Sequence, residues 1–277
     1  MKVIRSRDNA FVKQLIQLAH SSRERKKVGL TVLDGFQLVR AYIDAIGAPR
    51  AIAVAESALN LPEIAAWLPT IETNFPRTII NILSAPLIAE ASSLDSPAMV
   101  LAEVDTPQPR ATPFDASAVL VLEDVQDPGN VGSMLRSAAA AGVVEVVLSK
   151  SCAFAWSPKV LRAAQGAHFL LNIVEGAEVV QFVRQYQGQS LAFVPAASKA
   201  ASATAKNFYD CELTSATAFL MGNEGAGLSP QLLQVASVGV TVPMPGKVES
   251  LNAAACAAIA MFEMVRQRSV ATASSTA

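Results

Sequence analysis

The chain has 277 residues, of which 52% are hydrophobic and 16% charged, and its formal net charge is −1. This composition excludes a disordered chain, collagen and a coiled coil, and the length favours two domains. The longest stretch without charge lies between Glu224 and Lys247, and its glycines and prolines exclude a membrane span. Three scattered cysteines exclude a disulfide framework and a zinc-binding Cys pair. With no apolar leader at the N-terminus, they predict a cytoplasmic location.

The charge is unevenly distributed. Residues 1–27 carry a net +6, and the remaining residues carry −7. Such asymmetry favours a polyanionic partner at the basic end, although a solvated amphipathic helix would give the same pattern.

The first 104 residues predict a small α/β unit. Apolar spacing indicates helices over 8–21, 36–46 and 62–68, and strands over 30–33, 51–55 and 78–83, with a basic turn at 23–27. Residues 105–117 contain three prolines and predict an extended, semi-rigid linker.

A second α/β pattern fills residues 118–268. Apolar runs predict strands over 118–122, 143–148, 169–174, 191–194, 218–221 and 239–242. Helices are expected over 129–142, 158–164, 179–186, 230–235 and 250–268. This alternation predicts a mostly parallel sheet. The small polar residues 269–277 predict a disordered tail.

Three segments follow predicted strands, where open parallel sheets place their ligands. The first runs from Glu123 to Arg136, with Asn130 as the expected helix cap and Gly142 as the expected helix end. Gly132 lies four residues before Arg136, which would leave bare backbone beside a guanidinium suited to a phosphate or ribose. A capped surface helix with a solvated arginine is the alternative.

The second segment is Gly222-Asn223-Glu224-Gly225-Ala226-Gly227. It lacks the lysine of a nucleotide-triphosphate loop, so its glycines indicate close approach of a ligand to the backbone. Glu224 would accept from a hydroxyl, orient Arg136, or cap the next helix. The third segment runs from Val242 to Asn252. Its prolines fix the loop, Ser250 is an expected cap, and Met244 and Leu251 offer apolar walls for an adenine or thioether, or belong to the core.

Taken in order, the patterns D-P-G-N-V-G-x-x-x-R, G-N-E-G-x-G and P-M-P-G-x-x-x-S-L-N resemble the SpoU/TrmH branch of the SPOUT RNA methyltransferases. The resemblance implies transfer of a methyl group from S-adenosylmethionine to a ribose 2′-hydroxyl. It also implies a C-terminal trefoil-knotted domain with a mostly parallel sheet, a homodimer built through that domain, and no metal. Residues 1–104 resemble the family's small α/β substrate-binding domain.

The resemblance also assigns residues. Asn130, Arg136, Glu224, Ser250 and Asn252 are expected to be catalytic, with Arg136 touching the 2′-oxygen and Glu224 anchoring a network of Arg136 and Asn130. The cofactor is expected against Leu220, Gly222, Val242, Met244, Ser250 and Leu251. His168 is expected to be structural.

RNA is the expected partner, ribosomal RNA before tRNA. Its phosphates would meet the basic N-terminal residues Lys2, Arg5, Arg7, Arg23, Arg25, Lys26 and Lys27. A catalytically silent RNA-binding or ribosome-assembly factor is the alternative function. The sequence specifies neither the RNA nor the nucleotide.

Overall fold

The computed structural model describes residues 1–93, 99–195, 205–248 and 250–275. The chain divides into two compact units. Unit 1 comprises Met1–Gln108 with the later segment Trp156–Arg162, and unit 2 comprises Pro109–Ala155 and Ala163–Ala277.

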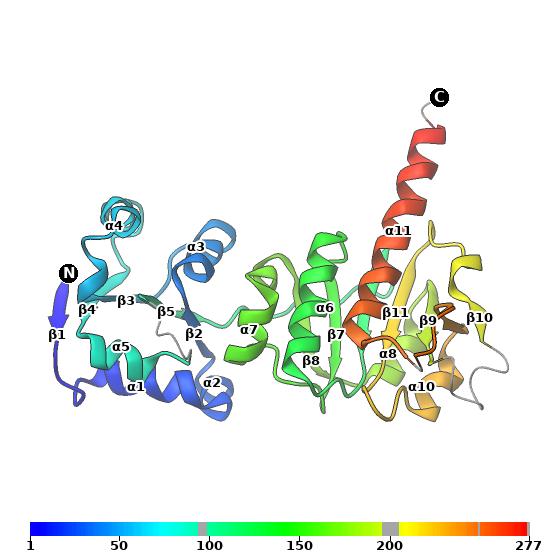
Figure 1. Ribbon diagram of the computed structural model, residues 1–277, viewed down its shortest axis with the longest axis horizontal. Helices are drawn as coiled ribbons and strands as arrows, with labels where there is room; N and C mark the ends of the chain where they lie inside the picture. The colour runs from blue at the N-terminus through cyan, green and yellow to red at the C-terminus, as the bar shows by residue number, and fades with distance from the viewer. Residues whose placement is uncertain (94–98, 196–204, 249, 276–277) are drawn as a thin grey trace. The chain divides into compact units, whose positions relative to one another are not determined.

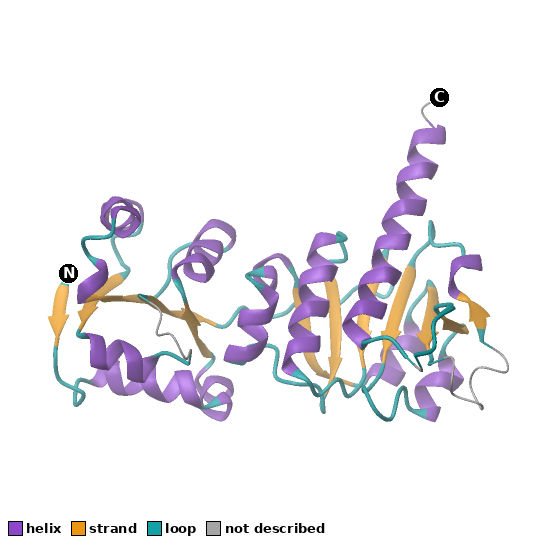
Figure 2. Cartoon of the chain, viewed as in Figure 1, coloured by secondary structure: helices purple, strands orange, loops and turns teal. Residues whose placement is uncertain are grey.

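Unit 1 is built on a five-stranded mixed sheet (Figures 1 and 2). Its strands lie in the order β1-β4-β3-β5-β2; β1, β4 and β3 are parallel, whereas β5 is antiparallel to both of its neighbours. The strands are β1 (Lys2–Ile4), β2 (Leu30–Asp34), β3 (Ala51–Ala55), β4 (Ile79–Leu83) and β5 (Val100–Asp105). The helices are α1 (Ala10–His20), α2 (Ser22–Val28), α3 (Phe36–Ala45), the short η1 (Glu56–Ala58), α4 (Pro62–Asn74) and α5 (Ala85–Ala91).

The basic segment at 23–27 is helical, and the predicted turn is wrong. Ser21 caps α2 by accepting from Glu24 N, and Gly29 ends it at φ 68. These caps satisfy one free N–H at the start and one free C=O at the end of a helix only seven residues long.

Unit 2 is an α/β layer structure with a seven-stranded parallel sheet in the order β10-β12-β9-β11-β6-β7-β8. The strands are β6 (Ala118–Leu122), β7 (Glu145–Ser149), β8 (Asn172–Ala177), β9 (Gln189–Phe193), β10 (Lys206–Asn207), β11 (Thr217–Met221) and β12 (Val238–Thr241). The helices are α6 (Pro128–Ala140), η2 (Ala167–Leu170), α8 (Val179–Gln185), η3 (Phe208–Asp210), α10 (Pro230–Val235) and α11 (Ala253–Ser275), while most of α7 (Pro158–Ala164) belongs to unit 1. The predicted mostly parallel sheet is confirmed.

Helices cover both faces of this sheet (Figure 1). On one face, Val183 of α8 and Leu232 of α10 pack with Val121 of β6 in one buried cluster. Because side chains alternate along a strand, Leu120 and Leu122 point to the opposite face, on the side of α6 and α11, which pack against each other. Burial on both faces explains why β6 is an unbroken apolar run.

Two predicted boundaries differ from the structure. Residues 167–170 form a 3₁₀ turn, and β8 begins only at Asn172. Residues 109–117 of the predicted linker belong to unit 2, where Asn172 exchanges hydrogen bonds with the main chain of Arg110 and the Tyr186 hydroxyl donates to Ala116 O.

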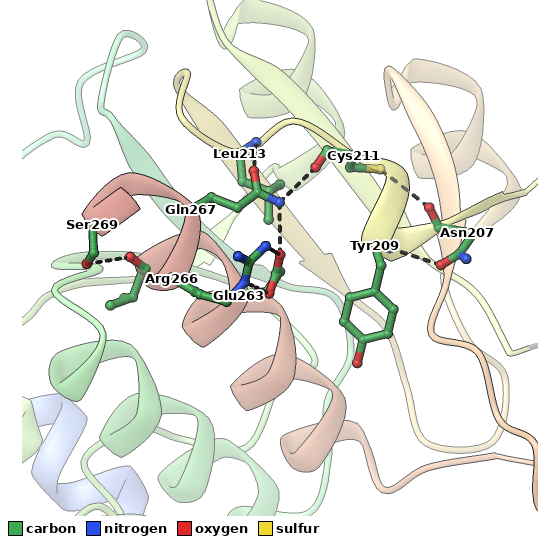
Figure 3. Close-up of polar contacts among 9 residues, drawn as sticks. Asn207, Tyr209, Cys211, Leu213, Glu263, Arg266, Gln267 and Ser269 are labelled. Atoms are coloured by element: carbon green, nitrogen blue, oxygen red, sulfur yellow. Dashed lines mark hydrogen bonds and ion pairs between the residues drawn. The ribbon is translucent and has the colours of Figure 1, made fainter. Parts of the chain in front are cut away.

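Helix α11 continues through Ser275, where a disordered tail from Ser269 was expected; residues 276–277 lie outside the described part. The preceding turns are fastened to the body of unit 2 (Figure 3). Gln267 accepts from Leu213 N at 2.9 Å and donates to Cys211 O at 3.0 Å, while Glu263 holds Gln267 and Arg266. The anchored helix therefore propagates into the polar residues. No helix in the described ranges is both long and apolar enough to cross a bilayer.

Candidate active site

The order in which the chain adds strands to the sheet reverses at β6. The chain builds β7 and β8 on one side of it and β11, β9 and β12 on the other. Open parallel sheets bind ligands at such a switch point, beyond the carboxyl ends of their strands. A cavity of about 400 Å³ opens beside this point, and residues at the carboxyl ends of β9, β11 and β12 line it together with the first turn of α11.

The cavity wall contains most of the residues predicted to bind a cofactor. Gly222, Val242, Met244, Ser250 and Leu251 all line it. Leu220 does not: its side chain is 0% exposed and belongs to the core of the sheet. It lies one residue before the end of β11 and its side chain points into the core, so the contact of Leu220 with the cofactor stays a prediction.

Several lining residues were missed by sequence reasoning. Phe193, Val194 and Pro195 close the cavity from the end of β9, and Thr241 and Cys256 complete it. A sequence signal for the residues at the end of β9 exists: this apolar strand is followed by a proline, as is the strand before Pro243. Burial raises the pKa of the Cys256 thiol to about 11, so this wall of the cavity carries a neutral thiol.

The first loop positions Asn130. Asp127, not Asn130, caps α6, because its carboxylate accepts from Asn130 N at 2.7 Å. Asn130 lies inside the first turn, which leaves its side chain available. The predicted end of this helix is confirmed, since Gly142 lies at φ 74 just after the cap Ala141.

Glu224 joins the first and second loops. Its carboxylate accepts from Asn130 Nδ2 at 2.9 Å, from Asp127 N at 3.3 Å and from Gln126 N at 3.4 Å. Burial alone would raise the pKa of the Glu224 carboxyl, but the hydrogen bonds from Asn130 and from main-chain N–H groups outweigh it and lower the pKa. Glu224 is therefore held as a carboxylate that only accepts.

Asn252 adds the third loop. It caps α11 by accepting from Ala254 N at 2.9 Å and Ala255 N at 3.2 Å, and it donates to Asn130 Oδ1 at 2.9 Å. Ser250, the expected cap, lies two residues too early and lines the cavity instead. A continuous chain of hydrogen bonds, Asn252 to Asn130 to Glu224, thus ties all three motifs together.

Arg136 is not part of this chain. Its side chain is exposed on α6, and it makes no hydrogen bond or ion pair with the residues that the structure describes. Of the predicted network of Glu224, Asn130 and Arg136, the described residues therefore form the contact between Glu224 and Asn130, and the part played by Arg136 stays a prediction. Gly132 is buried against neighbouring residues and leaves no bare patch beside the guanidinium.

The basic N-terminal residues are largely neutralised within unit 1. Arg25 is only 2% exposed and donates to Leu18 O and Trp156 O, each at 2.5 Å; burial lowers its pKa to about 10. It cannot contact RNA, and that prediction is wrong. Arg5, Arg7 and Lys27 form ion pairs with acidic residues of the same unit. Lys2, Arg23 and Lys26 are exposed, as are the three ion-paired side chains.

In the described ranges, no group of three or more His, Cys, Asp or Glu side chains is placed to bind a metal ion. His168 is buried and does not line the cavity, and its Nε2 donates to Ala155 O at 2.7 Å. Burial lowers its pKa to about 4, so it is a neutral structural residue near neutral pH.

Comparison with known proteins agrees with this geometry. Residues 117–262 match the model of the SpoU rRNA Methylase family. The chain is 30% identical over 269 residues to the 23S rRNA (guanosine(2553)-2′-O)-methyltransferase RlmP of Bacillus subtilis, covering 95% of this chain and 99% of that one. It is also 30% identical over 271 residues to an uncharacterized tRNA/rRNA methyltransferase of Synechocystis, covering 96% and 94%.

A solved structure shows the same fold over both units. The SpoU methyltransferase AviRb of Streptomyces viridochromogenes, in complex with AdoMet, superposes with a TM-score of 0.78 and 26% identity, covering 94% of this chain and 98% of that one. The three connected motifs, the matched family model and the full-length relatives lead to one conclusion: this chain belongs to the SpoU rRNA methylase family.

Proposed function

We propose that this protein transfers a methyl group from S-adenosylmethionine to a ribose 2′-hydroxyl of ribosomal RNA. The observation that carries the proposal is the hydrogen-bonded chain from Asn252 through Asn130 to Glu224 at the rim of the cavity. Family membership and the printed activity of the Bacillus relative support ribosomal RNA as the substrate class.

The cavity suits this cofactor. Its volume of about 400 Å³ lies in the range of small-molecule sites, and Phe193, Val242 and Leu251 supply the apolar walls that an adenine needs. Main-chain groups at Gly222, Val242 and Leu251 would hold the nucleoside, with Met244 as a further wall. When bound, S-adenosylmethionine supplies an electrophilic methyl group on a sulfonium, so no metal is required.

The protein's own residues orient the acceptor. Arg136 would hold the 2′-oxygen and the neighbouring phosphate, and stabilise the negative charge that develops on that oxygen. An arginine stays protonated in proteins, so it serves as an electrostatic group and not as the base; the proton leaves to phosphate or water. Asn130 would contact the ribose. Glu224 and Asn252 would fix the side-chain amide of Asn130, and Ser250 would complete the wall of the cavity.

The segments around the cavity fit the knot that the family resemblance implies. Loops from three separate parts of unit 2 meet at the carboxyl ends of the strands, and α11 packs against β11 and α6. We infer that the C-terminal segment is threaded as a trefoil knot.

Unit 1 would bind the RNA. Residues 1–108 contain eleven Lys and Arg and eleven Asp and Glu, so the attraction is local, from exposed residues such as Lys2 and Arg23, and not a property of the whole unit. Recognition by RNA shape and single-stranded bases is consistent with this weak charge.

A homodimer through unit 2 is supported by apolar side chains left on its surface. Phe262 of α11 is 47% exposed and Tyr209 is 49% exposed. Sedimentation of the wild type as a dimer, and of Phe262→Glu as a monomer, would support this. A monomeric wild type would exclude it. A cytoplasmic location follows from ribosomal RNA as the substrate.

The test is methyl transfer itself. Purified protein, tritiated S-adenosylmethionine and ribosomal RNA from a strain that lacks the gene should yield one 2′-O-methylated nucleotide, mapped by mass spectrometry. Binding of S-adenosylhomocysteine without methylation of ribosomal RNA or tRNA would instead favour the catalytically silent RNA-binding factor.

A further inference from the structure

Asp124 has an unusual backbone conformation just after strand β6. Its φ is 55, and Gln165 is the one other non-glycine residue with positive φ in the described ranges. Such a conformation costs free energy for most side chains, and persists where surrounding contacts hold it. Asp124 follows β6 by two residues and does not line the cavity.

Ser149, the last residue of β7, holds Asp124 in place. The Ser149 hydroxyl donates to Asp124 Oδ1 at 2.6 Å and accepts from Asp124 N at 2.9 Å. One side chain therefore satisfies both the carboxylate and the main-chain N–H of the strained residue. With its N–H and carboxylate bound to Ser149, Asp124 presents its main-chain carbonyl to the second loop.

That carbonyl accepts from Asn223 Nδ2 at 2.9 Å. The same Asn223 side chain uses its Oδ1 to accept from Gly225 N and Ala226 N, both at 2.9 Å. Asn223 and Gly227 also exchange main-chain hydrogen bonds, which closes the turn. A Cβ at Gly222 would overlap the Gly227 carbonyl, so the main chain at Gly222 packs directly against the end of this turn.

Glu224 lies in the middle of this turn. Its reach to Asn130 depends on where the turn is held, and Asn223 is the residue that holds it. We propose that Asp124 is a positioning residue for methyl transfer: latched by Ser149, its carbonyl fixes Asn223 and thereby sets Glu224 against Asn130. This inference rests on the proposed function, because it concerns the same site.

We call the two hydrogen bonds between Ser149 and Asp124 the latch. Different substitutions distinguish the loss of the latch from a change in the positive-φ backbone at Asp124. Asparagine tolerates positive φ and its amide oxygen can accept from Ser149, so Asp124→Asn should keep the latch. Asp124→Gly keeps the conformation but loses the acceptor. Ser149→Ala removes the hydroxyl from a residue outside the cavity wall. Ser190→Ala is the matched control, because Ser190 is a buried, hydrogen-bonded serine at the opposite end of the sheet.

The experiment measures kcat and KM for RNA, S-adenosylhomocysteine affinity by calorimetry, and thermal stability for these variants. We expect Asp124→Gly and Ser149→Ala to lower kcat about tenfold or more at unchanged KM for RNA, since small misplacements of site groups are costly. The double variant should be no worse than either single one, because both break the same latch. Asp124→Asn should stay within about twofold of the wild type, and Ser190→Ala should lose stability but not kcat.

Three results would overturn the latch: unchanged kcat in Ser149→Ala, an equal loss in Ser190→Ala, or an Asp124→Asn variant as defective as Asp124→Gly. Failure of the proposed function looks different. If the wild type binds S-adenosylhomocysteine but methylates no RNA, the latch is still testable, because Asn223, Glu224 and Gly225 of the turn line the cavity. The affinity for S-adenosylhomocysteine should then weaken in Asp124→Gly and Ser149→Ala and stay unchanged in Ser190→Ala.

Discussion

Glu224→Gln tests the hydrogen-bonded chain at the cavity rim. A carboxylate offers two acceptor oxygens, and Glu224 uses one for Asn130 and Asp127 N and the other for Gln126 N. Glutamine can keep its oxygen towards Asn130, but its NH₂ group then faces the Gln126 N–H. It also loses the charge that makes these bonds stronger.

The size of the effect follows from the geometry. Hydrogen bonds to charged groups contribute about 1.5–3 kcal/mol and neutral ones about 1 kcal/mol. The two bonds to Gln126 and Asp127 are long and Glu224 is exposed, so we expect a loss of about 1 kcal/mol in the free energy of unfolding. If misorientation of Asn130 raises the activation free energy of methyl transfer by the same amount, kcat falls about fivefold.

The assay combines methyl transfer to ribosomal RNA with urea unfolding at several pH values. The folded pKa of Glu224 lies below its ordinary value of 4.5, so its contribution is present above that pH and is lost as the pH falls through the folded pKa. The stability gap between wild type and Glu224→Gln should therefore be constant near neutrality and close below pH 4.5.

Glu263→Gln is the matched control, because hydrogen bonds from Arg266 and Gln267 lower the pKa of that carboxyl too, and Glu263 does not line the cavity. It should leave kcat unchanged. If Glu224→Gln methylates RNA at the wild-type rate, or if Glu263→Gln loses as much activity, the chain at the rim has no role in transfer.

Three further predictions concern residues elsewhere. Arg136→Ala should abolish methyl transfer while calorimetric affinity for S-adenosylhomocysteine stays within about twofold, since the guanidinium lies outside the cavity wall; normal turnover would remove Arg136 from the mechanism. Arg25→Ala should lower the free energy of unfolding by about 2 kcal/mol or more, because Leu18 O and Trp156 O lose their donor, whereas Arg23→Ala should change it little. The salt dependence of RNA binding should be the same in Arg25→Ala as in wild type. The pKa of His168 is about 4 in the folded protein against an ordinary 6.5, so the unfolded chain binds the proton first as the pH falls. The free energy of unfolding of the wild type should therefore fall as the pH drops from 6.5 towards 4, and His168→Gln should lack that slope. Equal slopes would show that another group titrates.

Sequence reasoning reached the architecture of unit 2 and the three loops of the site. Continuous apolar runs such as Ala118–Leu122 indicate strands buried on both faces, and Gly or Pro marks where they end. It failed where a partner from another part of the chain decides the outcome. Arg25 reads as a surface cation, yet the carbonyl of Trp156 takes its guanidinium. Asn130 reads as a cap, yet Asp127 takes that position and frees Asn130 for Glu224.

The sequence alone determined which residue types follow each strand, and so which chemistry the chain can present, because apolar periodicity and turn residues act locally. Only the tertiary structure decided which of these side chains meet. The parallel sheet brings the ends of β6, β9, β11 and β12 to one edge, where Asn130, Glu224 and Asn252 satisfy one another and Arg136 stays outside. Hydrogen-bond partners distant in sequence are chosen by that packing, and no local pattern encodes them.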